Sequence, residues 1–155
     1  MTHWIGIDPG QKGGLAYIKP DGTMWRCAQM PAVGGEVDAL GLFHLLSDWT
    51  TGGSGVKVAI EQVHSMPGQG VSSTFKFGKN FGIAIGVVAG LQLPLHRITP
   101  QTWKKQFVLT GKDKDASRGK ASELWPDMAE NWRFKYMNGI SDAALIAECA
   151  RRAGL

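Results

Sequence analysis

Two short apolar segments of the chain each end in a carboxylate. Trp4 to Ile7 is followed by Asp8, and Val56 to Ile60 is followed by Glu61. Such segments are typical of buried strands, and burying a carboxylate without a positive partner costs several kcal/mol. We therefore expect a cation near these strand ends. For Asp8, ordinary turn chemistry in the sequence Asp-Pro-Gly is the alternative explanation.

A third carboxylate, Asp142, lies in the first turn of the last helix expected in the chain. An acidic residue in the first turn of a helix is also favoured by the helix dipole, so Asp142 has a structural explanation too. Taken together, the three side chains form an oxygen-only ligand set, which selects Mg²⁺ or Mn²⁺ over zinc. Two such ions about 3.5–4 Å apart support in-line displacement at phosphorus, where one activates water and the other stabilises the leaving oxygen.

Positive charge is concentrated in one part of the sequence. Between Arg97 and Lys120 there are seven basic and two acidic residues, whereas the net charge of the 155-residue chain is only +4. A basic segment on a nearly neutral domain is typical of a surface that binds a polyanion; solvated lysines along a helix are the alternative. Together with the carboxylates, this segment predicts a nuclease.

The elements that would position these residues follow an α/β pattern. We expect three antiparallel strands and then two parallel ones, in a mixed five-stranded sheet flanked by helices. The strands are expected at 3–8, 14–19, 24–30, 56–60 and 94–98, and the helices at 37–49, 71–91, 101–107, 117–125 and 141–152. Thr99 and Pro100 suit the N-cap and first position of the third helix.

Four glycines recur at every fourth position of the helix expected at 71–91, at Gly78, Gly82, Gly86 and Gly90. This spacing places them on one stripe, where a bare backbone lets another element approach closely. The sheet and a second copy of the chain are the two candidates for that element.

Length and composition favour one domain spanning residues 1–155. The longest apolar run, 81–91, is too short to cross a bilayer, and the N-terminus lacks the pattern of a signal peptide. We therefore expect a cytoplasmic protein without membrane attachment. Cys27 and Cys149 are expected to be free thiols.

Several motifs resemble one known family. The stretches IGIDPG, AIEQVHSMPGQGVSSTFKFGKNFG, ITPQTWKK and GISDAALIAECARR are similar, in this order, to motifs of the RuvC-type Holliday-junction resolvases. The compact version found in phages and prophages is the most similar. The resemblance implies a ribonuclease-H-like fold, a homodimer, and metal-dependent cleavage of four-way DNA junctions in a bacterial or phage-infected cell.

The resemblance also assigns roles to individual residues. Asp8, Glu61 and Asp142 match the family's metal-binding carboxylates, and Lys104 matches a lysine that follows Thr-Pro. Either Lys114 or Arg118 matches a second basic residue near the cleaved phosphate, and we name Lys114 as catalytic. The wider set expected to bind DNA is His64, Phe75, Lys76, Lys104, Lys105, Lys112, Lys114 and Arg118. Phe75 and Phe77 are also candidates for the core or for a dimer contact.

One position departs from the family. A fourth carboxylate is usual near the last helix, whereas this chain has Asn138 ahead of Asp142. An amide oxygen can bind Mg²⁺ but brings no charge. Asn138 is therefore a fourth candidate metal ligand. The missing carboxylate also supports an alternative function, in which the protein binds branched DNA without cutting it.

A third function class is the actin-like and sugar-kinase-like ATPases, which share a related core and an Asp-Gly strand turn. Those proteins need two such domains, and this chain has no second glycine-rich phosphate loop. The nuclease is the function that the sequence favours.

Overall fold

A computed structural model describes all residues, 1–155, and is built around a five-stranded sheet. The strand order is β3-β2-β1-β6-β7, with β1 antiparallel to β2, β2 antiparallel to β3, and β6 parallel to both β1 and β7. The strands are β1 (His3–Asp8), β2 (Gly14–Ile18), β3 (Met24–Gln29), β6 (Val56–Glu61) and β7 (Leu95–Ile98). The predicted mixed sheet is therefore confirmed.

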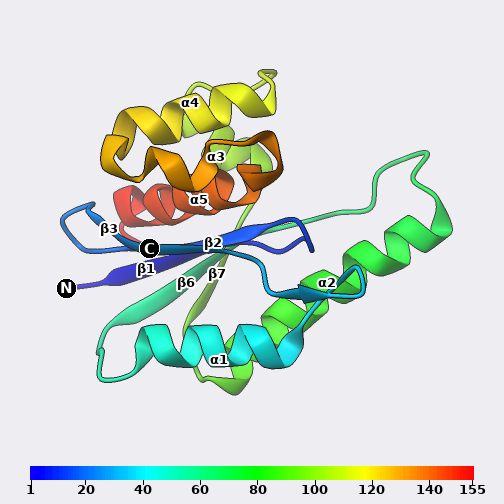
Figure 1. Cartoon of the computed structure of the whole chain (residues 1–155), viewed down its shortest axis with the longest axis horizontal. Helices are drawn as coiled ribbons and strands as arrows, with labels where there is room; N and C mark the ends of the chain where they lie inside the picture. The colour runs from blue at the N-terminus through cyan, green and yellow to red at the C-terminus, as the bar shows by residue number, and fades with distance from the viewer.

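Helices cover both faces of the sheet (Figure 1). One face is covered by α1 (Ala39–Thr50) and α2 (Val71–Gly90), and the other by α3 (Pro100–Gln106), α4 (Lys114–Leu124) and α5 (Asn138–Ala153). Side chains alternate between the two cores along β1, so that Trp4 packs with α5 whereas Ile5 and Ile7 pack on the opposite side.

Glycines allow α5 to lie directly on the sheet. A Cβ atom at Gly6 in β1 would clash with the Ala143 carbonyl oxygen, and one at Gly14 in β2 would clash with the backbone of Gly139 and Ile140. Gly13 and Gly139 form an isolated parallel bridge at the same place. This close approach fixes the N-terminal end of α5 beside the end of β1, where Asp8 lies.

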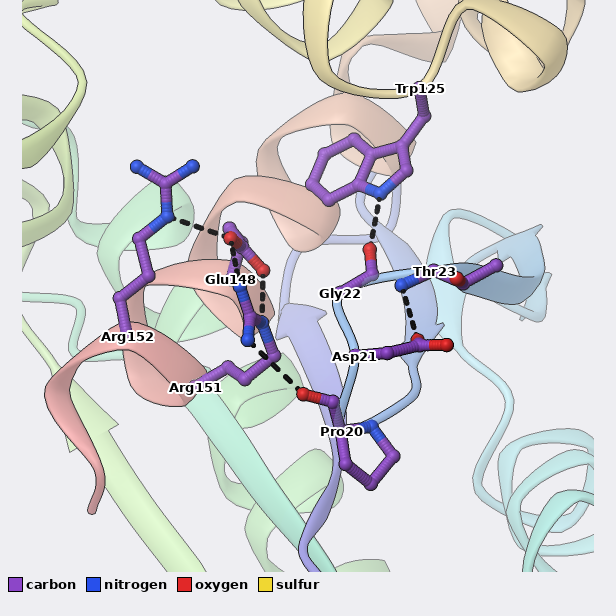
Figure 2. A network of polar contacts seen from close by, with 8 residues as sticks. All are labelled: Pro20, Asp21, Gly22, Thr23, Trp125, Glu148, Arg151 and Arg152. Atoms are coloured by element: carbon purple, nitrogen blue, oxygen red, sulfur yellow. Dashed lines mark hydrogen bonds and ion pairs between the residues drawn. The ribbon is translucent and has the colours of Figure 1, made fainter.

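Polar contacts fix the other end of α5 (Figure 2). Buried Glu148 pairs with Arg151 and Arg152, each at 2.7 Å, and Arg151 donates a hydrogen bond to the Pro20 carbonyl at 3.1 Å. Pro20 lies in the turn between β2 and β3, and in the same turn the Gly22 carbonyl accepts a hydrogen bond from the Trp125 indole at 2.9 Å. The helix is therefore held at both ends, which makes it a rigid support for any side chain near its start.

Several predicted boundaries were wrong. Val37 belongs to a small hairpin of β4 (Ala32–Val33) and β5 (Glu36–Val37) and not to α1. Helix α4 begins at Lys114 and not at 117, because the Asp113 side chain caps the Ala116 amide at 3.0 Å. Helix α5 begins at Asn138 and not at 141, so Asp142 lies beyond its first turn and the helix-dipole explanation does not apply.

The predicted start of α3 at Thr99 and Pro100 is confirmed, with the Thr99 side chain accepting from the Thr102 amide. Two short 3₁₀ segments, η1 (Pro126–Trp132) and η2 (Lys135–Met137), were not predicted. Both cysteines are free, as predicted. None of the helices combines the length and the apolar character needed to cross a bilayer.

Helix α2 packs on the sheet through a narrow stripe. Its buried residues are Asn80, Ala84 and Val88, and the glycine stripe lies about 200° around the helix from them. Cβ atoms placed on the glycines at 78, 82, 86 and 90 would meet nothing within 4 Å. The glycine stripe therefore faces away from the sheet, which excludes the sheet as one of the two candidates for the element that packs on it.

The first half of α2 and the loop before it project beyond the sheet (Figure 1). Phe75 is 71% exposed and Phe77 is 37% exposed, so neither belongs to the core as one interpretation of the sequence suggested. This half of the helix presents aromatic and basic side chains, including Lys76, to solvent.

Candidate metal centre

The fold brings the three carboxylates to one edge of the sheet. Parallel strands β1 and β6 pair Ile7 with Ile60, so Asp8 and Glu61, the next residue of each strand, end at the same edge. Helix α5 crosses β1 on one face and carries Asp142 to this edge. The side chains of Asp8, Glu61 and Asp142 therefore converge at this edge of the sheet.

The pKa values of the three side chains reflect this convergence. Burial, together with the charges of Asp142 and Glu61, raises the pKa of Asp8 from 3.8 to about 8, while Lys114 and the Gly10 amide act in the opposite direction. Burial is also the main cause of a raised pKa at Glu61 and at Asp142. A site that raises carboxyl pKa values in this way favours a bound cation.

Two side chains from neighbouring helices orient the carboxylates of Glu61 and Asp142. The Trp103 indole donates a hydrogen bond to Glu61 Oε2 at 2.6 Å, and Ser117 Oγ donates one to Asp142 Oδ1 at 2.5 Å. In this arrangement, no three acidic, histidine or cysteine side chains are positioned to hold one ion together. A shared ion therefore requires the three side chains to lie closer together, and the second oxygen of each of these two carboxylates, Glu61 Oε1 and Asp142 Oδ2, is free to bind it.

Asn138 lies next to Asp142 on α5. The two residues are separated by one helical turn, which places them on the same face of the helix. Asn138 is 6% exposed, and its Oδ1 is a buried acceptor without a hydrogen-bond partner. Buried acceptors are rarely left without a partner. A hard cation fits this position, because amide and carboxylate oxygens are the ligands that Mg²⁺ and Mn²⁺ prefer.

Three of the predicted basic residues surround the opening of the site. Lys104, Lys112 and Lys114 line a small cavity of about 50 Å³ that also contains Asp142 and Ser117. The positive charges of Lys104 and Lys114 lower the pKa of both Glu61 and Asp142, so these two lysines lie within electrostatic range of the carboxylates.

Arg118 has other partners. Its guanidinium bonds to Asp115 at 2.6 Å and to the Arg133 carbonyl at 2.8 Å, and the side chain is half-buried. These contacts join α4 to the end of η1. Of the two alternatives for a basic residue near the phosphate, the geometry therefore favours Lys114.

The remaining predicted DNA-binding residues lie on the outer surface. Lys105 is exposed on α3, and His64 is exposed in the loop between β6 and α2. Phe75 and Lys76 are exposed on the projecting half of α2. They are not part of the carboxylate cluster, but all are open to a large ligand.

Trp103 and Ser117 were missed as site residues. Trp103 stands in the ITPQTWKK stretch, but the sequence predicted no role for it. It is buried, but its indole nitrogen reaches Glu61. For Ser117 there was no sequence signal, because its hydroxyl meets Asp142 only through the packing of α4 on α5.

Neither a comparison with models of protein families nor one with curated proteins finds a match. The structure is similar to that of Thermus thermophilus RuvC, with a TM-score of 0.71 and 16% identity over 99% of this chain and 97% of that one. It is also similar to T. thermophilus RuvC in complex with a Holliday junction substrate, with a TM-score of 0.72, 15% identity and the same coverage. The predicted ribonuclease-H-like fold is thereby confirmed.

Proposed function

We propose that this chain is a metal-dependent endonuclease that cuts four-way and other branched DNA. The observation that carries the proposal is the convergence of Asp8, Glu61 and Asp142 at one sheet edge, beside lysines on α3 and α4. The fold shared with a protein solved on a Holliday junction supports the choice of substrate.

Asp8, Glu61, Asp142 and the Asn138 amide oxygen would hold Mg²⁺ or Mn²⁺, as two ions. When bound, the ions supply an activated water and neutralise the charge on the leaving oxygen. The donor chemistry fits, because all four side chains offer oxygen and the Asn138 oxygen has no other partner.

The remaining roles belong to this chain's own residues. Lys114 begins α4 beside the carboxylates, where its ammonium group holds a phosphate oxygen and offsets developing negative charge. Lys104 and Lys112 attract the DNA backbone to the opening of the site. Trp103 and Ser117 act as positioning residues, because each restricts the orientation of one carboxylate.

The exposed side of α2 supports a homodimer in this proposal. Its glycine stripe meets nothing within 4 Å, so a second helix could approach the backbone closely there. Two copies related by a two-fold axis would present two sites to a symmetric junction, as paired incision requires. Such a protein would work where the DNA is, in the cytoplasm of a bacterial or phage-infected cell.

The dimer has a direct test. Light scattering should give twice the chain mass at micromolar concentration, and Gly82→Leu should give the monomer mass. The monomer fold should tolerate this change, because nothing lies within 4 Å of a Cβ at Gly82. A monomer mass for the unmodified chain would contradict the dimer.

The activity is tested on synthetic DNA. The chain is incubated with a labelled four-way junction, a fork and a linear duplex of the same sequence, with Mg²⁺ or Mn²⁺ and with EDTA. We expect metal-dependent nicks near the branch point and little cutting of the duplex. Junction binding without nicks would favour the non-catalytic alternative. ATP hydrolysis without nicks would favour the actin-like class.

A further inference from the structure

A large cavity lies beside the carboxylate site and has no role in the proposed chemistry. Its volume is about 850 Å³, within the range of about 300–1,000 Å³ usual for small-ligand pockets. The wall includes Gln11, Lys12, Gln29, Phe134, Lys135 and Tyr136. None of these residues was selected from the sequence.

Two aromatic rings form one side of this cavity. Phe134 and Tyr136 stack with an interplanar angle of 6° and ring centroids 5.7 Å apart. Their exposed fractions are 50% and 65%, so both rings are open to solvent. Parallel exposed rings are the surface on which an unpaired base stacks, irrespective of which base it is.

The polar part of the wall suits a nucleotide. Lys12 and Lys135 bring positive charge, Gln11 and Gln29 bring amides that can donate to and accept from a base edge, and the wall contains no acidic residue. A cation or an amine would therefore find no counter-charge in this cavity. A planar group attached to a phosphate matches both parts of the wall.

The backbone connects the cavity to the carboxylates. Lys12 and Gly13 end the turn that begins after Asp8, and Gly13 forms the backbone bridge to Gly139. Tyr136 precedes Asn138 by two residues, so their Cα atoms are at most about 7 Å apart. A strand with one phosphate at the carboxylates would therefore bring a neighbouring nucleotide to the cavity.

We infer that this cavity receives an unpaired base of the DNA strand whose phosphate lies at the carboxylates, with Tyr136 and Phe134 as its stacking surface. The inference rests on the proposed function and deepens it. A base inside a duplex is stacked on both sides and cannot enter, whereas a base at a branch point is released at lower cost. The cavity would thus favour branched DNA over duplex DNA.

The test uses four-way junctions in which 2-aminopurine replaces one base at a time within three nucleotides of the branch point. Emission and binding are measured with Ca²⁺ in place of Mg²⁺ for the unmodified chain, Tyr136→Ala, Tyr136→Phe and Phe43→Ala. Phe43 is a matched control, because it is also exposed and aromatic but lies on α1, across the sheet.

We expect an emission change at one or two positions only. Tyr136→Ala should abolish this change and weaken junction binding by about tenfold, with less than a twofold effect on duplex binding. Tyr136→Phe keeps the ring and should behave as the unmodified chain does, as should Phe43→Ala.

Two results would overturn the inference while leaving the proposed function intact: no position-specific emission change on a tightly bound junction, or a change that persists in Tyr136→Ala. A lower mass of Tyr136→Ala by light scattering would also overturn it, because the rings would then belong to a contact between copies. By contrast, equal binding of junction and duplex by the unmodified chain would count against the proposed function itself.

Discussion

Asn138→Asp restores the carboxylate that the family resemblance leads us to expect, at a position where the structure can accept it. The two side chains have nearly the same volume, and the Asn138 oxygen is buried without a hydrogen-bond partner. One helical turn separates residue 138 from Asp142, so a new carboxylate would face the same metal ions. We expect tighter metal binding and faster cutting, with little change in junction affinity.

The size of the effect follows from the added charge. A tenfold gain in metal affinity corresponds to about 1.4 kcal/mol, and at saturating metal this gain is added to the stability of the folded state. For a domain of this size, each kcal/mol raises Tm by about 2–4 °C. The metal-induced rise in Tm should therefore be about 3–6 °C larger in Asn138→Asp than in the unmodified chain.

The assay combines thermal unfolding with single-turnover cleavage of a four-way junction across a Mn²⁺ titration. The Asp variant should cut at least about tenfold faster at low metal, with a smaller advantage at high metal. Asn131→Asp is the control, because Asn131 lies in η1 and its amide bonds only to the Met128 carbonyl. If Asn138→Asp shows the same metal-induced Tm rise and the same rates as the unmodified chain, Asn138 is not a ligand position.

Two further predictions concern charge. Replacing Lys104 and Lys114 by alanine should reduce the slope of log affinity against log salt concentration by about two, as measured by fluorescence anisotropy on a junction. An unchanged slope would mean that these lysines do not contact the DNA. Alanine substitutions of Lys19 and Lys57, which lie at the opposite end of the strands, serve as controls. Because Asp8 has a pKa of about 8 when folded and an ordinary value of 3.8, the folded state binds the extra proton, and metal-free stability should fall as pH rises from about 4 to 8. Urea unfolding in EDTA should show this fall and Asp8→Asn should flatten it, whereas stability that rises over this range would contradict the burial of Asp8.

Much of the fold was predictable because its strands are short, apolar and separated by strong turn signals. Asp8 and Glu61 could be paired in advance, because the ends of parallel strands meet at one edge. The boundaries of α4 and α5 were less predictable. Asp113 caps α4 earlier than the apolar pattern indicates, and the start of α5 depends on the close packing of Gly13 on Gly139.

The parts of the site that the sequence did not reveal depend on tertiary contacts. Trp103 and Ser117 reach their carboxylates from helices that are distant in sequence from Glu61 and Asp142 respectively. The stacking of Phe134 on Tyr136 occurs in a 3₁₀ region without apolar periodicity, which gives no pattern to detect. Conversely, Arg118 fitted the basic pattern but its charge is used to join α4 to η1.

The central claim is that Asp8, with Glu61 and Asp142, binds the metal that cuts the DNA. Cleavage and binding of one four-way junction should be measured side by side for the unmodified chain and for Asp8→Asn, in Mg²⁺ and in Mn²⁺. The substitution removes the negative charge that Asp8 would bring to a bound metal at the end of β1, but it keeps the size of the side chain. We predict that cutting is lost in both metals while junction affinity stays within a few-fold. Cutting that persists in Asp8→Asn, or binding that is lost while cutting remains, would contradict the claim.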